Sequence, residues 1–322
     1  MLRRLLERSD LLVENQRVGG LARLGFPDAE LERLNPRLVH VAVTGFGTDG
    51  PYADRPGYDF VIQAMAGLMS ITGRPDSEGG EPTKVGVAVA DLATGMLAAV
   101  AALAALLGRE RPGGPGAGLG QRIDMSLLEA SIAWLANQAS NYLVGGVVPG
   151  RLGNQHPNIT PYETFRTRDG TIAVAVGSER QWPRFCDAIG IPGLAHDARF
   201  VRNSLRVENR AALRAILAER MASADSATWL DRLDIAGIPC GPINSLDQVF
   251  ADPQVVARHV VETVAHPTIG EVRMTGTPFR LQRTPAAVRS APPLLGQHTG
   301  EILDWLGYDA AEIARLRDAG VA

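Results

Sequence analysis

Asp91 is the residue whose type and position best suit covalent chemistry. It follows the small apolar residues 87–90 and precedes an alanine- and leucine-rich stretch that predicts a helix over 91–107. Aspartate is a favoured helix N-cap, and a helix N-terminus stabilises the ionised carboxylate. One oxygen could therefore cap the helix while the other attacks an activated carbonyl. Gly95, one turn further on, leaves room for a ligand to approach.

Lys84 is a second candidate, because it is the only lysine in the chain. The strong bias towards arginine is what a GC-rich bacterial genome would produce. Lys84 nevertheless lies only seven residues before Asp91. We read that position as weak support for a site that requires a compact ammonium group.

The segment Gly45-Phe46-Gly47-Thr48-Asp49-Gly50 has the spacing of a dinucleotide-binding loop. Such a loop must open directly into a helix that faces the pyrophosphate. Here Pro51 follows at once, and Arg55-Pro56-Gly57 interrupts any helix within two turns. We therefore expect a tight turn at the end of a strand rather than a nucleotide site.

Other familiar catalytic patterns are missing from the sequence. It contains no GxSxG elbow, no GxxxxGK[ST] loop and no HExxH motif, and its six histidines are scattered. His156 lies in the polar loop 153–157, where a structural or solvated role is the default. We expect no metal site and no permanently bound cofactor.

The composition is that of a soluble globular protein, with 322 residues, 45% hydrophobic and 21% charged. A net charge of −3 gives no basic surface for nucleic acid and no polybasic membrane anchor. The most apolar segment, 85–107, contains Asp91, and we interpret it as a strand and a buried helix rather than a membrane span. Cys186 and Cys240 are far apart, as expected for reduced thiols in a cytoplasmic protein.

Apolar periodicity predicts alternating helices and strands in the first half of the chain. Helices are expected at 2–8, 27–34, 57–69, 91–107 and 126–144, and strands at 11–14, 38–44 and 82–90. This alternation indicates a parallel α/β sheet. An irregular stretch at 145–161 is the candidate interdomain linker.

The pattern changes at Asp169, where shorter amphipathic elements begin. Strands are expected at 170–176 and 271–281, and helices at 180–189, 206–222, 226–236 and 300–306. A last helix should open at Asp309, because Glu312 three residues later completes a capping box.

A series of short motifs, in order and spacing, resembles the class III CoA-transferase family, the group of formyl-CoA transferase and the carnitine and bile-acid CoA-transferases. The motifs are Asn15 to Gly25, Leu34-Asn35-Pro36-Arg37, Gly45-Phe46-Gly47, Gly50-Pro51-Tyr52, Pro56-Gly57-Tyr58-Asp59, Lys84-Val85-Gly86, Ala90-Asp91, Gly120-Gln121, Asp124, Gly153-Asn154, His156-Pro157, Asp169-Gly170, Pro239-Cys240-Gly241-Pro242 and His298-Thr299. No single motif is strong, but the series covers essentially the whole chain.

The resemblance implies a mixed α/β fold. A large Rossmann-like domain would comprise residues 1–150 and 282–322, and a smaller α+β domain residues 165–281. It also implies two chains interlocked as a homodimer. The family's chains usually begin roughly ninety residues earlier, with the first strand of the Rossmann-type domain. We therefore expect that this chain lacks the family's N-terminal segment, and that the glycine-rich loop 111–118 is a surface insertion.

The resemblance also implies ping-pong chemistry in which Asp91 attacks an acyl-CoA thioester. The family's CoA contacts map onto Asn15, Gln16, Arg17 and Arg23, and onto Gly57, Tyr58 and Asp59. Arginines suit the CoA phosphates, because their guanidinium groups bind phosphate with two parallel hydrogen bonds. Lys84 is a further CoA-binding candidate, and Asn154 and His156 are candidates for binding the acceptor.

Acyl-CoA racemases share this fold but carry a histidine where this sequence has Tyr58. Tyrosine, with a pKa of about 10, is a poor substitute for that acid/base. The Gly-Tyr-Asp and Gly-Asn-x-His-Pro patterns most resemble transferases that use succinyl-CoA and small dicarboxylic acids. The alternatives are a racemase-like enzyme, or a truncated, inactive homologue that only binds CoA or dimerises.

Overall fold

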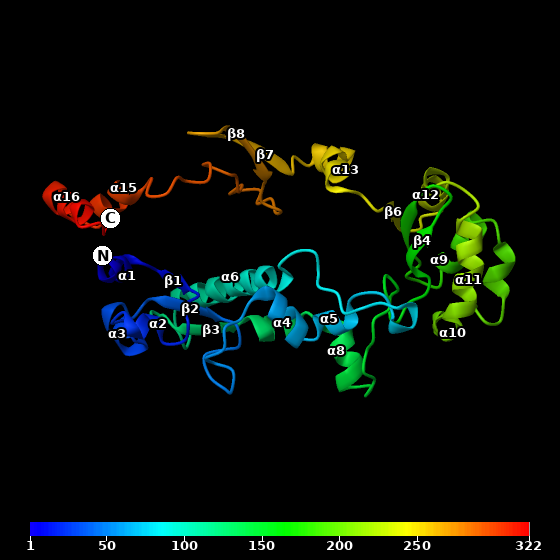
Figure 1. The fold of residues 1–322 in the computed structure, drawn as a ribbon, viewed down its shortest axis with the longest axis horizontal. Coiled ribbons are helices and arrows are strands. Elements are labelled where there is room, and N and C mark those ends of the chain that lie inside the picture. Colours follow the sequence, from blue (N-terminus) through cyan, green and yellow to red (C-terminus); the bar gives the residue numbers. More distant parts are fainter. Residues whose placement is uncertain (322) are drawn as a thin grey trace. The chain divides into compact units, whose positions relative to one another are not determined.

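The computed structural model describes residues 1–321, which form two compact units, Met1–Pro157 and Asn158–Ala322 (Figure 1). The assignment of residues 282–322 to the same domain as residues 1–150 stays a prediction.

The first unit is built on a parallel sheet of three strands in the order β1 (Leu11–Glu14), β2 (Val39–Thr44) and β3 (Arg122–Ser126). The parallel α/β class predicted from the sequence is confirmed. Strand β3 was missed. Its side chains alternate between half-buried and exposed positions, so the strand lacks the continuous apolar run that marks β2.

The helices of this unit are α1 (Leu2–Arg8), α2 (Gly20–Arg23), α3 (Asp28–Leu34), α4 (Asp59–Met65), α5 (Leu68–Ile71), α6 (Val89–Glu110), α7 (Leu127–Ala133) and α8 (Ala136–Leu143). Two predicted helices are each interrupted once. The helix expected at 57–69 breaks at Gly67, which has a φ of 88°. The helix expected at 126–144 is replaced by α7 and α8.

The strand expected at 82–90 does not form, and that prediction is wrong. Residues 81–87 join no sheet, and α6 begins already at Val89. Its N-cap is Ala88, whose side chain accepts no hydrogen bond, so Asp91 is the third residue of the helix rather than its cap. Alanine has the highest helix propensity, and Ala90 favours this earlier start.

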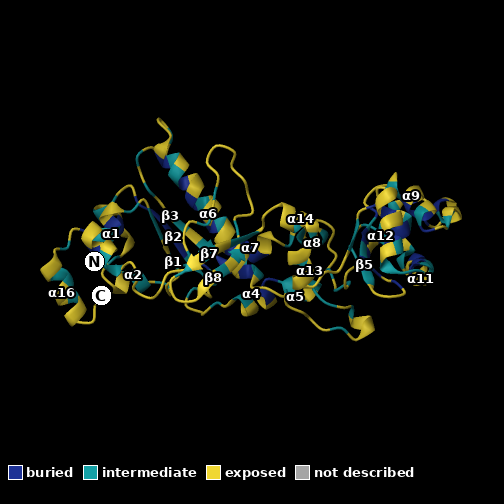
Figure 2. Cartoon of the chain, turned by 90° about the horizontal axis from the view of Figure 1, so that it is seen from above, coloured by how far each residue is buried: buried dark blue, intermediate teal, exposed yellow. Residues whose placement is uncertain are grey.

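Helix α6 packs one face on the sheet and exposes the other. Ala98, Ala102 and Ala105 are buried against Val39 and Val41 of β2. Among residues 1–321, α6 is the one helix whose length and apolar character would suffice to cross a membrane. Its alternation of buried and exposed residues is visible along its length (Figure 2).

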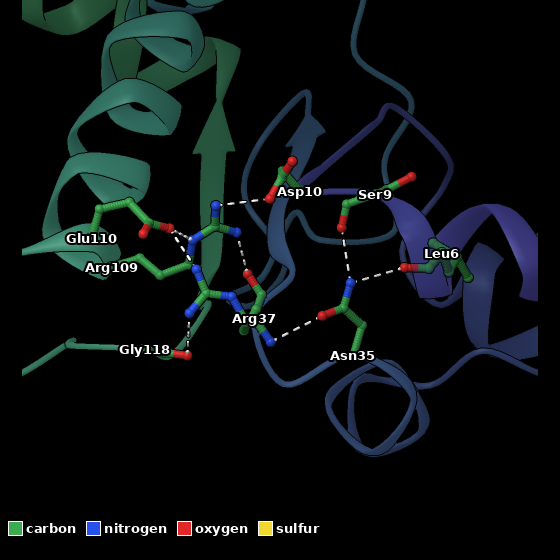
Figure 3. Close-up of polar contacts among 8 residues, drawn as sticks. All are labelled: Leu6, Ser9, Asp10, Asn35, Arg37, Arg109, Glu110 and Gly118. Carbon is green, nitrogen blue, oxygen red and sulfur yellow. Dashed lines mark hydrogen bonds and ion pairs between the residues drawn. The ribbon is translucent and has the colours of Figure 1, made fainter.

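Buried Arg109 anchors the C-terminal end of α6 (Figure 3). Its guanidinium donates to the carboxylates of Asp10 and Glu110 and to the Arg37 carbonyl, each over 2.8 Å. Asn35 extends the network, because its amide donates to two carbonyl oxygens at the end of α1 and its oxygen accepts the Arg37 N–H. The Leu-Asn-Pro-Arg motif therefore has a structural role, which is to tie α1, β2 and α6 together.

The second unit contains an antiparallel sheet in the order β4 (Tyr162–Arg166), β5 (Thr171–Ala175) and β6 (Cys240–Pro242). Helices α9 (Gln181–Ala188), α10 (Asn203–Glu208), α11 (Arg210–Met221) and α12 (Ser226–Ile235) accompany the sheet. Their fully buried core includes Ile172, Trp182, Phe185, Leu213 and Trp229. Both cysteines are free thiols, and burial raises the pKa of Cys186 to about 12, so this thiol is unreactive.

The rest of this unit contains a hairpin and four short helices. Strands β7 (Val261–His266) and β8 (Gly270–Thr275) pair antiparallel, so the strand predicted at 271–281 ends earlier than expected. The helices are α13 (Leu246–Ala251), α14 (Pro253–Ala257), α15 (Thr299–Trp305) and α16 (Ala310–Asp318). The predicted capping box of Asp309 and Glu312 is confirmed at the start of α16.

Replacing Arg109 with methionine tests the anchor at the end of α6. The variant keeps the apolar stem but leaves Asp10 and the Arg37 carbonyl without their donor, and Glu110 with the Arg37 guanidinium alone. We expect urea denaturation to show a loss of about 1–3 kcal/mol in the free energy of unfolding. Arg111→Met, at an exposed position two residues away, should change it by less than about 0.5 kcal/mol. Equal stability of the two variants would contradict the anchoring role.

Candidate active site

The predicted site residues follow the carboxyl ends of the parallel strands. Asn15 comes directly after β1, and Gly45 directly after β2. Because β1 and β2 run parallel, these two chain segments leave the sheet at the same edge. Open α/β sheets bind their ligands at this edge.

Two glycines bring Tyr58 and Asp59 to the end of β2. A Cβ added to Gly57 would lie 2.4 Å from the Gly45 Cα, and one added to Gly45 would lie 2.6 Å from the Gly57 Cα. The two backbones therefore touch, and no other residue fits at either position. This contact places the start of α4 beside the carboxyl end of β2.

The loop between Gly45 and Gly57 is held in place by hydrogen bonds to residues of the parallel strands. The Thr44 hydroxyl accepts the Gly47 N–H over 2.9 Å, and the Asp124 carboxylate accepts both the N–H and the hydroxyl of Thr48. No helix begins in residues 45–58. The predicted tight turn is confirmed, and this loop does not have the geometry of a dinucleotide fingerprint.

Asp59 links α4 to the start of α6. One oxygen of its carboxylate accepts the Ala90 N–H over 2.8 Å, and the other accepts the Gln63 amide N–H over 2.6 Å. The Gln63 carbonyl in turn accepts the Val85 N–H over 2.9 Å. Asp59 therefore satisfies a free N–H at the N-terminus of α6, the task that the sequence analysis assigned to Asp91.

The Asp91 carboxylate is left free. It makes no hydrogen bond or ion pair with any of residues 1–321, and the residue is exposed. Partial desolvation raises the pKa of Asp91, and the negative charge of Asp59 raises it further. The site therefore holds a carboxylate that is more basic than usual and has both oxygens available for reaction.

The other predicted CoA-binding side chains lie around this edge and are exposed. The Arg23 guanidinium donates to the Val18 carbonyl over 3.3 Å, and the Lys84 ammonium donates to the Val85 carbonyl over 3.2 Å. Tyr58 is 75% exposed. Asn15, Gln16 and Arg17 form the turn before α2, where a Cβ at Gly20 would meet the Gln16 side chain at 2.7 Å.

Asn154 and His156 belong to a segment that packs on the turn formed by residues 73–81. The Gly153 N–H donates to the Gly73 carbonyl over 2.9 Å, and the Arg151 guanidinium donates to the Arg74 carbonyl over 3.2 Å. Gly73 has a φ of 120°, and a Cβ there would meet the Glu81 carbonyl oxygen at 2.5 Å. The structure therefore couples the predicted acceptor loop to the 73–81 turn.

Gln63 was missed in the sequence analysis although it is fully buried. A signal was present, because Gln63 lies four residues after Asp59, the spacing at which side chains on a helix meet. The structure also has a cavity of about 240 Å³ at the amino ends of β2 and β3, lined in part by Arg122 and by the buried His40. None of the predicted catalytic, CoA-binding or acceptor-binding residues lines this cavity. Residues 1–321 hold no cluster of three possible metal ligands.

The sequence matches the family described as CoA-transferase family III over residues 1–299. The chain belongs to this family. It is an enzyme of the CoA-transferase class, and its substrates are therefore CoA thioesters.

This CoA-transferase is 42% identical to the succinate–glutarate CoA-transferase of Agrobacterium fabrum over 94% of this chain and 74% of the relative. It is 38% identical to the human succinyl-CoA:glutarate CoA-transferase, over 100% of this chain and 72% of that protein. The crystal structure of a CAIB/BAIF family protein from Brucella suis is 42% identical and superposes with a TM-score of 0.78, covering 95% and 77% of the two chains.

The raised pKa of Asp91 gives a prediction about stability. A carboxyl whose pKa is higher in the folded state favours folding when protonated, and this advantage is lost as pH rises from the unfolded pKa through the folded one. At pH 7 the charge therefore opposes folding slightly. We expect Asp91→Asn to be at least as stable as the parent at pH 7 in urea denaturation. A clear loss of stability would show that Asp91 has a structural partner after all.

Proposed function

We propose that this CoA-transferase moves CoA from succinyl-CoA to a small dicarboxylic acid such as glutarate, with Asp91 as the covalent carrier. The observation that carries the proposal is the free, basic carboxylate of Asp91 at the carboxyl edge of the sheet, with Asp59 taking over the capping task. The names of the relatives from Agrobacterium and human support the donor and acceptor.

The proposed reaction has four steps, and Asp91 takes part in each of them. Its carboxylate attacks the thioester carbonyl of the donor, the C–S bond breaks, and a mixed anhydride and CoA thiolate result. The thiolate attacks the Asp91 carbonyl, which releases the donor acid and leaves an aspartyl-CoA thioester. The acceptor carboxylate then displaces CoA to form a second anhydride. The thiolate attacks the acceptor carbonyl, which yields the new acyl-CoA and free Asp91.

Every step exchanges one activated acyl group for another, so no external energy source is consumed. The basicity of Asp91 favours its attack on the donor thioester, because nucleophilicity rises with basicity within a class of oxygen nucleophiles. No proton has to be transferred, since carboxylate and thiolate react as anions. This suits a site in which the carboxylate has no general base bonded to it among residues 1–321.

The proposed CoA site uses exposed groups around the same edge. Arg17 and Arg23 would bind the phosphates, and Lys84 would add a third positive charge. Asn15, Gln16 and Tyr58 would contact the rest of CoA, and the loop with Asn154 and His156 would bind the acceptor acid. Gly57, whose backbone touches Gly45, would place the start of α4 beside the bound CoA.

We also propose a homodimer, as the family resemblance implies. Support comes from the outer face of α6, where the large apolar side chains are exposed at helical spacing and unsuited to water. The exposed residues of this face are Leu92, Met96, Val100, Leu103 and Leu107. A cytoplasmic location stays a prediction.

Asp91→Asn tests the proposed function, because the amide keeps the shape of the side chain but cannot form an anhydride. We expect CoA transfer from succinyl-CoA to glutarate to fall by about 10³-fold or more. Asp54→Asn, at an exposed position in the loop before α4, should keep the parental rate. Transfer by Asp91→Asn at the parental rate would refute the role of Asp91. Exchange of the α-proton of a 2-methylacyl-CoA for deuterium, without transfer, would show a racemase instead.

A further inference from the structure

Gln63 is a polar side chain in a fully buried position, and both ends of its amide are used. The nitrogen donates to the Asp59 carboxylate, and the oxygen accepts the Val85 N–H. A buried amide without partners is costly, so these bonds fix the rotamer of Gln63. The bond to Asp59 lies within α4, whereas the bond from Val85 comes from a segment that belongs to no helix or sheet.

The two bonds hold the segment that leads to Asp91. Asp59 and Gln63 lie one turn apart on α4 and bind the segment at Ala90 and at Val85. Between these points the chain joins no sheet and contains Gly86, which adds conformational freedom. The contact with α4 therefore fixes where α6 begins, and in this way it also fixes the position of Asp91.

The amide of Gln63 also determines the electrostatics beside Asp91. The hydrogen bond from Gln63 occupies one oxygen of the Asp59 carboxylate and keeps the other turned towards the Ala90 N–H at the start of α6. Among the described residues, Asp59 is the ionisable group whose charge raises the pKa of Asp91, in addition to partial burial. The Lys84 ammonium is hydrogen-bonded to the Val85 carbonyl instead. Loss of the Gln63 bond would free the Asp59 carboxylate to turn away from α6, which would weaken the influence of its charge on Asp91.

We propose that Gln63 is a positioning residue for the Asp91 nucleophile: through Asp59 and the Val85 N–H it sets the place of the attacking carboxylate and holds the Asp59 carboxylate beside it. The proposal rests on the function proposed above for Asp91. Gln63 touches no substrate, so its effect should appear in the chemical step and its pH dependence rather than in substrate affinity.

The test compares Gln63→Leu, Gln63→Glu and a control, Gln138→Leu, which removes a glutamine that bonds only to Asn141 on the surface helix α8. For Gln63→Leu we expect kcat to fall by about 10- to 100-fold, because a small misplacement of a reacting group costs this much. KM for succinyl-CoA should stay within about threefold of the parent. The acid limb of the kcat–pH profile should shift to lower pH. The control should match the parent in all three.

Gln63→Glu serves as the conservative rescue. When the new carboxyl is protonated it can donate to Asp59 and accept from Val85 as the amide does. We expect activity close to that of the parent at low pH, lost as the carboxyl ionises beside Asp59. Activity that is low at every pH, or unchanged at every pH, would overturn the positioning role. This variant also decides the question if Gln63→Leu does not fold.

Amide hydrogen exchange provides a readout that does not depend on activity. In Gln63→Leu, exchange at Val85 and Ala90 should speed up at least tenfold, with α7 and the control variant unchanged. If Asp91→Asn is inactive while Gln63→Leu keeps the parental kcat, pH profile and exchange, the positioning role is wrong and the proposed function stands. If Asp91→Asn is active, the proposed function fails, and with it the proposal for Gln63.

Discussion

The hydrogen bond from the Ala90 N–H to the Asp59 carboxylate is the contact on which the candidate active site depends. A helix N-terminus must satisfy its free N–H groups, and α6 does this with an acid from another helix. Asp91, one residue later, is therefore not needed to cap the helix. Partial burial raises the pKa of Asp91, and the charge of the same acid raises it further, so this contact fixes the geometry of the site and adds to its basicity.

Helix α6 is fixed at both ends by groups far away in the sequence. Its N-terminal end is held by Asp59, and its C-terminal end by the buried guanidinium of Arg109, which reaches Asp10 and the Arg37 carbonyl. Between them its alanines pack flat on β2. Small side chains allow this close approach of helix and sheet. Because the helix is held at both ends, it keeps Asp91 in a fixed position.

The sequence allowed the parallel sheet to be predicted through two short, mainly apolar strands, 11–14 and 38–44, which are confirmed as β1 and β2. The capping box at Asp309 was equally visible, because its signal is local. The start of α6 was misplaced, since a run of valine and alanine suits either a strand or a helix. The bond between Asp59 and Ala90 spans 31 residues, and no local pattern encodes such a contact. Asp91 and the CoA-binding residues stay predictions about function.

The central claim is that Asp91 becomes covalently attached to CoA during turnover. The most direct measurement is mass spectrometry of the intact enzyme after mixing with succinyl-CoA and rapid quenching in acid, followed by mapping of the modified peptide. We predict that the peptide containing residues 89–93 gains the mass of one CoA minus one water, as a thioester requires, and that this added mass is lost on treatment with hydroxylamine and absent in Asp91→Asn. CoA transfer without such an adduct, or an adduct on another residue, would contradict it.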